Sequence, residues 1–112
     1  MLSFQRLDVY QCAIQFVSIA MQIAGMLPRG HGELKDQLRR AAFSLPLNIA
    51  EGAGRASDAD GARHYAIARG SAMECAAILD VIRALNVGAE DQYAPAMQLL
   101  ARLVAMLTKM CR

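Results

Sequence analysis

Hydrophobic residues dominate the first and last segments of the chain, and single polar residues interrupt them at regular intervals. In the first segment the polar residues are three or four positions apart, at Asp8, Gln11, Gln15, Ser18 and Gln22. Such steps trace one narrow line along an α-helix. The last segment shows a similar line through Gln98, Arg102 and Lys109. We therefore predict helices over about residues 4–27 and 91–110.

Two further helices are predicted between these segments, over about residues 33–54 and 58–86. The third helix has clear end signals, because Ser57 can cap its first turn, Asp60 can reach back toward that cap, and Asn86 can end it. No strand pattern, internal repeat or linker interrupts the chain. Short connections favour antiparallel neighbours. The sequence thus predicts one all-α domain spanning the whole chain, an up-and-down antiparallel four-helix bundle.

The first and last helices are more hydrophobic than a bundle of this size requires. A helix at the edge of a monomeric bundle buries an apolar stripe about 100° wide or somewhat wider, whereas here roughly two-thirds of the circumference is apolar. An exposed apolar surface of this extent marks an interaction site. We therefore expect the protein to form an obligate oligomer.

Composition refines this picture mainly by exclusion. Hydrophobic residues make up 55% of the chain and the net charge is only +2, so charge alone does not indicate nucleic-acid binding. Three widely separated cysteines without a CxxC pair predict free thiols, with neither a zinc site nor a disulfide. Polar residues interrupt the apolar stretch between Cys12 and Gly25, which therefore lacks the roughly 18 unbroken apolar residues of a membrane span. We expect a soluble, cytoplasmic protein that makes no membrane contact.

The segment SLPLNIAEGAGRAS, residues 44–57, places a proline, an asparagine and glycines inside a predicted helix. Its polar residues belong to a single helical line, formed by Arg40, Ser44, Asn48, Glu51 and Arg55. Pro46 lies beside this line and removes one backbone hydrogen bond, so we expect it to kink the second helix or to split it near Phe43. Gly52 and Gly54 are expected to cap this helix and to form the turn that follows.

The third helix carries a matching polar line of His64, Ser71 and Glu74. Gly70 lies beside this line. Because a glycine inside a helix costs about 1 kcal/mol relative to alanine, it suggests close approach of a neighbouring backbone. We expect the two lines to face each other, within a subunit or across a subunit contact. The predicted structural network consists of Ser44, Asn48, Glu51, Ser71 and Glu74.

No pattern of catalytic or metal-binding residues stands out. The chain contains no HExxH motif, no Glu-x-x-His pair, no P-loop and no nucleophile elbow. The GAG tripeptide lacks the preceding strand of a dinucleotide-binding loop. His31 lies in a Gly-rich turn, and His64 is expected at the surface or at an interface. The sequence predicts a protein that is not an enzyme and that has no cofactor and no metal.

The two central helices resemble those of a known family. The segment LKDQLRRAAFSLPLNIAEGAGRAS, followed by YAIARGSAMEC, is similar to the hallmark of small bacterial four-helix-bundle proteins. That family was first noticed as reading frames within intervening sequences of 23S rRNA genes. The resemblance covers residues 4 to about 85, and the NIAEG block is its most specific part. The last helix matches only in its apolar character.

The resemblance implies a homopentameric ring of bundles. It also implies kinship to the accessory protein of diversity-generating retroelements, which resembles a basic pentameric barrel that engages a reverse transcriptase and nucleic acid. The chain departs from the family pattern at Gly61 and Ala62, where a bulky aromatic residue is usual. It is also less basic than the retroelement branch.

Two functions are compatible with these observations. The first is a non-enzymatic oligomeric scaffold or adaptor for a protein partner, such as a reverse transcriptase. The alternative is a weakly sequence-specific accessory protein that binds RNA or DNA through an arginine surface repeated around a ring. The arginines assigned to that surface are Arg39, Arg40, Arg55, Arg63 and Arg69. In the first case the arginines are solvated charges, and Arg40 pairs with Asp36 or Glu51.

Overall fold

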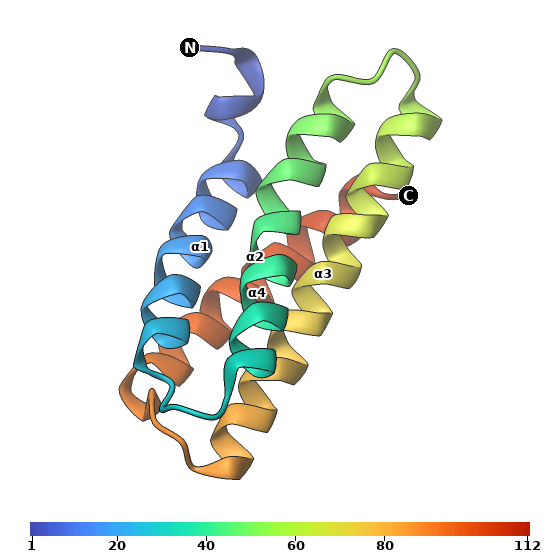
Figure 1. Ribbon diagram of the computed structural model, residues 1–112. Helices are drawn as coiled ribbons and strands as arrows, with labels where there is room; N and C mark the ends of the chain where they lie inside the picture. Colours follow the sequence, from blue (N-terminus) through green and yellow to red (C-terminus); the bar gives the residue numbers. More distant parts are fainter.

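Four α-helices joined by short turns make up the computed structural model, which describes residues 1–112. The helices are α1 (Asp8–Met26), α2 (Gly32–Ala53), α3 (Asp58–Leu85) and α4 (Glu90–Met110), and a short 3₁₀ helix, η1 (Ser3–Arg6), precedes them. Figure 1 shows that the chain direction reverses at each turn. The protein is therefore all-α, with four helices and no strand.

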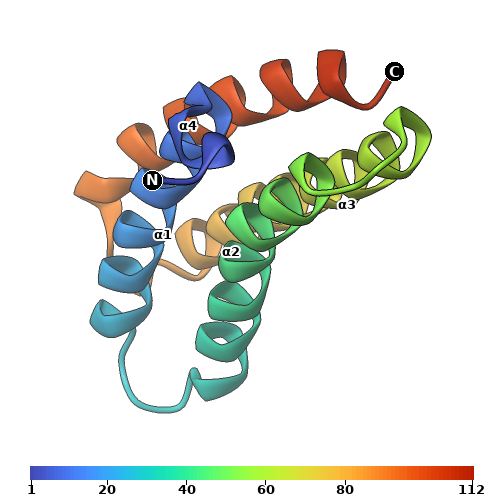
Figure 2. The same ribbon diagram turned by 90° about the horizontal axis from the view of Figure 1, so that it is seen from above.

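Each helix packs against two of the others. The backbones of α1 and α3 each come close to both α2 and α4, whereas those of the diagonal pairs α1–α3 and α2–α4 do not. Figures 1 and 2 show α2 and α3 side by side along their length, with α4 running across the opposite side of the molecule. This arrangement leaves the outward faces of α2 and α3 next to each other on one surface.

The hydrophobic core draws on all four helices, as the helical spacing of the apolar residues predicts. Its largest fully buried side chains include Phe16 of α1, Leu38 and Leu45 of α2, and Leu100 and Leu103 of α4. α3 contributes small residues along most of its length, such as Ala68 and Ala72, together with isoleucine and leucine near its end. Small side chains let α3 approach its neighbours closely, which matters for the contacts described below.

The first predicted helix is shorter than expected, because Leu7 is extended (φ −65°, ψ 133°) and separates η1 from α1. Hydrogen bonds from Gln5 and Gln11 stabilise this break. The Gln5 side-chain oxygen accepts the Leu2 N–H at 2.7 Å, and the Gln11 side chain donates to the Gln5 carbonyl at 3.2 Å. Local side-chain bonds thus replace helical bonds at the break.

The end signals of α3 act largely as predicted. Ser57 Oγ accepts the backbone N–H of Asp60 at 3.1 Å, and Asn86 ends the helix in the left-handed conformation (φ 54°). The Asp60 carboxylate does not reach back to the cap, since it pairs with Arg63 at 3.6 Å.

α2 continues as one helix through Pro46, so the predicted split near Phe43 is wrong. Pro46 is buried. Asn48 Nδ2 donates to the Ser44 carbonyl at 2.9 Å, one turn back along the same helix. The kink stays a prediction.

The exposed apolar surface lies mainly on helices other than those expected. Only Ile14 and Met26 are large exposed apolar residues of α1, and α4 has none. The corresponding residues of α2 and α3 are Phe43, Leu47, Ile67, Met73, Val81 and Leu85. The bundle buries or half-buries most of the apolar circumference of α1 and α4, because each of these helices packs against two neighbours.

One helix, α1, is long and apolar enough to cross a membrane when judged by length and composition alone, although its line of polar residues predicted otherwise. A buried core helix passes the same test. In this structure α1 contributes Phe16, Ala20 and Ile23 to the core.

Candidate interaction surface on helices α2 and α3

A row of hydrogen-bonded polar side chains lies between α2 and α3. Ser71 Oγ donates to Ser44 Oγ at 2.7 Å, and Asn48 Nδ2 donates to the same Ser44 oxygen at 2.9 Å. Asn48 Oδ1 lies 3.3 Å from His64 Nδ1. We call Ser44, Asn48, His64 and Ser71 the polar seam. Three of its members belong to the network predicted from sequence, and His64 is the addition.

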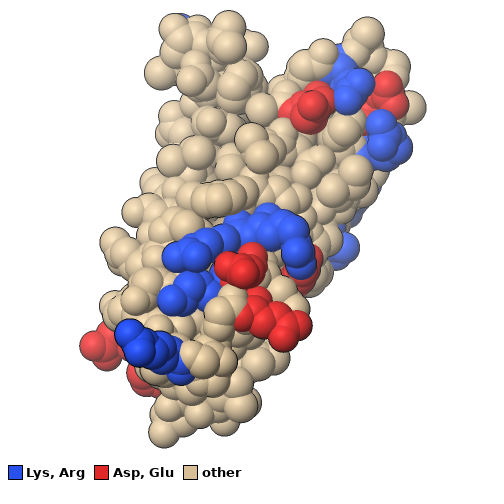
Figure 3. Space-filling view, viewed as in Figure 1, with Lys and Arg blue, Asp and Glu red and all other residues tan.

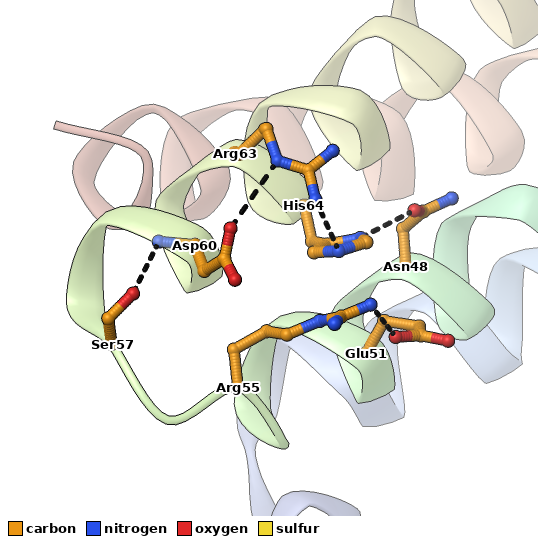
Figure 4. Close-up of polar contacts among 7 residues, drawn as sticks. All are labelled: Asn48, Glu51, Arg55, Ser57, Asp60, Arg63 and His64. Carbon is orange, nitrogen blue, oxygen red and sulfur yellow. Dashed lines mark hydrogen bonds and ion pairs between the residues drawn. The ribbon is translucent and has the colours of Figure 1, made fainter.

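His64 is a buried member of the seam, with 8% of its surface exposed, rather than a surface histidine. Its second ring nitrogen, Nε2, lies 3.3 Å from the Arg63 guanidinium (Figure 4). Since arginine can only donate, Nε2 accepts this bond and Nδ1 carries the proton that is donated to Asn48. Both bonds therefore fit a neutral imidazole. The sequence does indicate a place for His64 beside α2, because His64 lies on the same helical line as Ser71.

The two glutamates of the predicted network lie outside the seam. Glu51 forms an ion pair with Arg55 at 2.7 Å, near the turn between the helices (Figure 4). Glu74 is exposed and has neither a hydrogen bond nor an ion pair within the chain. The structure thus brings together the uncharged members of the two predicted lines and leaves both carboxylates in solvent. This is the arrangement expected from the high cost of burying a charge.

Four of the five arginines proposed for nucleic-acid binding have a polar partner within the chain, and the common surface stays a prediction. Arg39 pairs with Asp36 at 3.9 Å, while Arg55 and Arg63 pair with the carboxylates given above. Arg69 Nε donates to Thr108 Oγ1 at 2.8 Å, between α3 and α4. Figure 3 shows basic and acidic side chains intermixed on the face that carries α2.

Arg40 is the one member of this set without an ion pair or hydrogen bond in the chain. The predicted pairing of Arg40 with Asp36 or Glu51 is wrong, because each carboxylate is paired with another arginine of α2 or its following turn. All pairs formed here are one helical turn apart, which is the commonest geometry for ion pairs on a helix.

Gly52 and Gly61 lie where the backbones of α2 and α3 approach each other closely. A Cβ atom at Gly61 would lie 2.9 Å from the Gly52 carbonyl oxygen, and one at Gly52 would lie 2.6 Å from the Tyr65 ring. Gly52 is buried inside α2, so its predicted role as a cap is wrong, whereas Gly54 does cap the helix. A Cβ atom at Gly70 would meet no atom within 4 Å, so no close approach occurs there within the chain, and an approach by another subunit stays a prediction.

The three cysteines are free thiols. Burial raises the pKa of Cys75 to about 12, and the neighbouring Glu74 charge contributes to the same rise. Burial also raises the pKa of Cys12, although the Arg102 charge opposes this effect. Both buried thiols are therefore protonated at neutral pH, which makes them poor nucleophiles and poor metal ligands. No group of three or more His, Cys, Asp or Glu side chains is placed to hold a metal ion.

The family described as 23S rRNA-intervening sequence protein matches the chain over residues 5–109. The chain belongs to this family. The match extends through α4, beyond residue 85, where the recognisable motifs end. A comparison with curated proteins gives no match.

The hallmark residues of this 23S rRNA-intervening sequence protein have identifiable structural roles. In the NIAEG block, Asn48 belongs to the polar seam, Ile49 is fully buried, and Gly52 meets the backbone of α3. In the following helix, Ser71 completes the seam. These hallmark residues therefore contribute to the packing of α2 against α3.

Proposed function

We propose that this 23S rRNA-intervening sequence protein is a non-enzymatic, oligomeric adaptor that binds a protein partner through the outer faces of α2 and α3. One observation carries the proposal. Six large apolar side chains are exposed on these two helices, and none is exposed on α4. Leu47, with 64% of its surface exposed, is the most exposed large apolar residue within a helix. Apolar surface concentrated on one side of a molecule is typical of protein interfaces.

The chemistry of the buried polar groups supports a binding role over catalysis. The two buried polar residues, His64 and Ser71, both use their side chains in the seam. No buried side-chain nitrogen or oxygen lacks a hydrogen-bond partner. A catalytic site usually holds a strongly perturbed acid or base that faces substrate. Here His64 contacts Asn48 of α2 and Ser71 donates to Ser44 of α2.

Site-specific photo-crosslinking in the native cell tests the proposal. A photoreactive phenylalanine analogue placed at Ile67 or Val81 is expected to give discrete adducts with another protein. The same analogue at Gln98, on the exposed side of α4, should give none. Adducts that contain only this chain, from every position, would contradict partner binding through α3.

A second candidate function is RNA or DNA binding. The absence of a carboxylate partner for Arg40 favours it, because an unpaired arginine is free to contact phosphate. The ion pairs of Arg39, Arg55 and Arg63 weigh against it, since each carboxylate repels phosphate from the same place. No aromatic side chain alternates with these arginines to stack on bases.

Binding of a generic structured RNA across a salt series separates the two functions. For an adaptor we expect no micromolar binding and no steep dependence of log affinity on log salt. A nucleic-acid binder would show a steep negative slope, and Arg39→Ala/Arg63→Ala would reduce both affinity and slope. The control is Arg102→Ala/Arg112→Ala. It also removes two positive charges, one from α4 and one from the last residue of the chain. If the protein is an adaptor, both double variants should still bind the protein partner and should keep the wild-type oligomeric state.

A further inference from the structure

One charged side chain on the outward face of α2 has no partner within the chain, and two exposed apolar side chains follow it. Arg40, Phe43 and Leu47 are separated by steps of three and four residues, so they lie in one line along the helix. All three residues are exposed, and Arg40 has neither an ion pair nor a hydrogen bond. We call these three residues the α2 strip.

A shallow hollow of about 560 Å³ lies along the α2 strip. All three residues of the strip line it, and Ser44 and Asn48 of the polar seam also border it. The two seam side chains are already bonded, since Asn48 donates to Ser44 at 2.9 Å and Ser44 accepts a further bond from α3. Among these five residues, Arg40 is therefore the only polar one whose side chain has no partner.

The charges around the hollow leave a single positive charge without compensation. Asp36 and Arg39 also line the hollow, and they pair with each other at 3.9 Å. Their charges cancel, and the charge of the Arg40 guanidinium remains. A planar guanidinium presents its N–H groups as a fork that fits the two oxygens of a carboxylate. The hollow is thus complementary to one carboxylate next to an apolar side chain.

We infer that the α2 strip binds a helical segment of the protein partner, and that this segment carries an Asp or Glu one helical turn from a large apolar residue. The carboxylate pairs with Arg40, while the apolar side chain packs against Phe43 and Leu47. The inference rests on the proposed function and deepens it, because it specifies the chemistry that the partner presents to α2.

A helical segment suits this surface better than an extended one. An α-helix bonds its backbone groups internally, so α2 has no row of free N–H and C=O groups to which an extended segment could add. An extended segment would leave its own backbone groups unpaired against apolar side chains. A helix satisfies its own backbone and presents only side chains. Its residues three or four apart also have the same spacing as Arg40 and Phe43.

A phosphate backbone suits the same surface less well than a carboxylate. Nucleic-acid binding depends on several cations placed along the chain of phosphates. The α2 strip has one cation and then two apolar side chains, which gain nothing from contact with phosphate. The carboxylates of Asp36 and Glu51 lie about one helical turn beyond the two ends of the strip and repel a polyanion. A single carboxylate needs only Arg40.

Photo-crosslinking from Phe43 in the native cell tests the inference. A photoreactive phenylalanine analogue replaces Phe43 in the full-length chain, and mass spectrometry of the adduct identifies the crosslinked residue. We expect that residue to belong to another protein and to lie three or four positions from an Asp or Glu. In the same background, Arg40→Glu should lower the yield of the adduct about tenfold, because attraction between the two charges becomes repulsion.

Two further variants separate this contact from general charge effects. Arg102→Glu on α4 makes the same charge change at another exposed arginine and should leave the yield unchanged. Replacing the identified Asp or Glu of the partner by arginine should restore the adduct of the Arg40→Glu chain, since opposite charges then meet again. Circular dichroism checks that each variant of this chain keeps its helices, which is expected because both arginines are exposed.

Four outcomes would overturn the inference. They are an unchanged yield in Arg40→Glu, an equal loss in Arg102→Glu, a crosslinked segment with no acidic residue at the expected positions, and adducts that contain only this chain or only nucleic acid. With adducts to another protein from Ile67 or Val81, any of these rejects the inference and keeps the proposed function. An adduct from Phe43 that depends on Arg40, without adducts from α3, would keep the inference and reject partner binding through α3. No adduct with another protein from any position would reject both.

Discussion

Replacing Gly61 by alanine is expected to lower the free energy of unfolding by up to about 2 kcal/mol, although alanine is the better helix former. The added Cβ would lie 2.9 Å from the Gly52 carbonyl oxygen, which belongs to the backbone of α2. The helices must therefore separate locally, and this overpacking, typically about 1–3 kcal/mol, outweighs the gain of about 1 kcal/mol in helix propensity. Chemical denaturation followed by circular dichroism measures the change.

Gly70 provides the matched control for this prediction. It lies in the same helix and faces open space, so Gly70→Ala should raise the stability by about 1 kcal/mol. The two substitutions are chemically identical and are expected to have opposite signs. If Gly61→Ala also stabilises the protein, the contact between the backbones of α2 and α3 is looser than described.

Asn48→Leu is expected to destabilise the protein by about 1–3 kcal/mol, since it leaves a buried polar group without its partner. Asn48 is the central residue of the polar seam and bonds to both Ser44 and His64. Leucine has a similar size but cannot accept the hydrogen bond from His64 Nδ1. Thermal and chemical denaturation measure the loss, and light scattering shows whether the assembly loosens at the same time.

Gln15→Leu serves as the control, because Gln15 is an exposed amide on α1 outside the seam. It should change the stability by no more than about 0.5 kcal/mol. An Asn48→Leu variant that melts like the wild-type protein and keeps the native mass would show that the seam contributes neither to stability nor to assembly.

The sequence predicts the helices and their main faces well, because both depend on local spacing. Along the polar line of α1, Gln11, Gln15 and Gln22 are exposed, and the cap at Ser57 forms as expected. The pairing of Ser44 with Ser71 could also be anticipated, since two small polar lines inside apolar helices need each other as partners.

The roles of individual glycines and charges could not be predicted in the same way. A glycine inside a helix indicates either a close neighbour or an empty face, and only the packing separates Gly61 from Gly70. Likewise, Asp36 can pair with an arginine three or four residues further on. The choice of Arg39 over Arg40 depends on side-chain geometry that spacing does not specify.

The contact between α2 and α3 is more extensive than that between any other two helices. The two helices are also neighbours in sequence, and the seam and the glycine contact involve residues of α2 and α3 alone. Transient opening of the bundle should therefore begin with α1 or α4 and leave this hairpin closed. The surface proposed to recognise other proteins lies on the part of the molecule that opens last, so recognition can persist through fluctuations that expose the rest of the core.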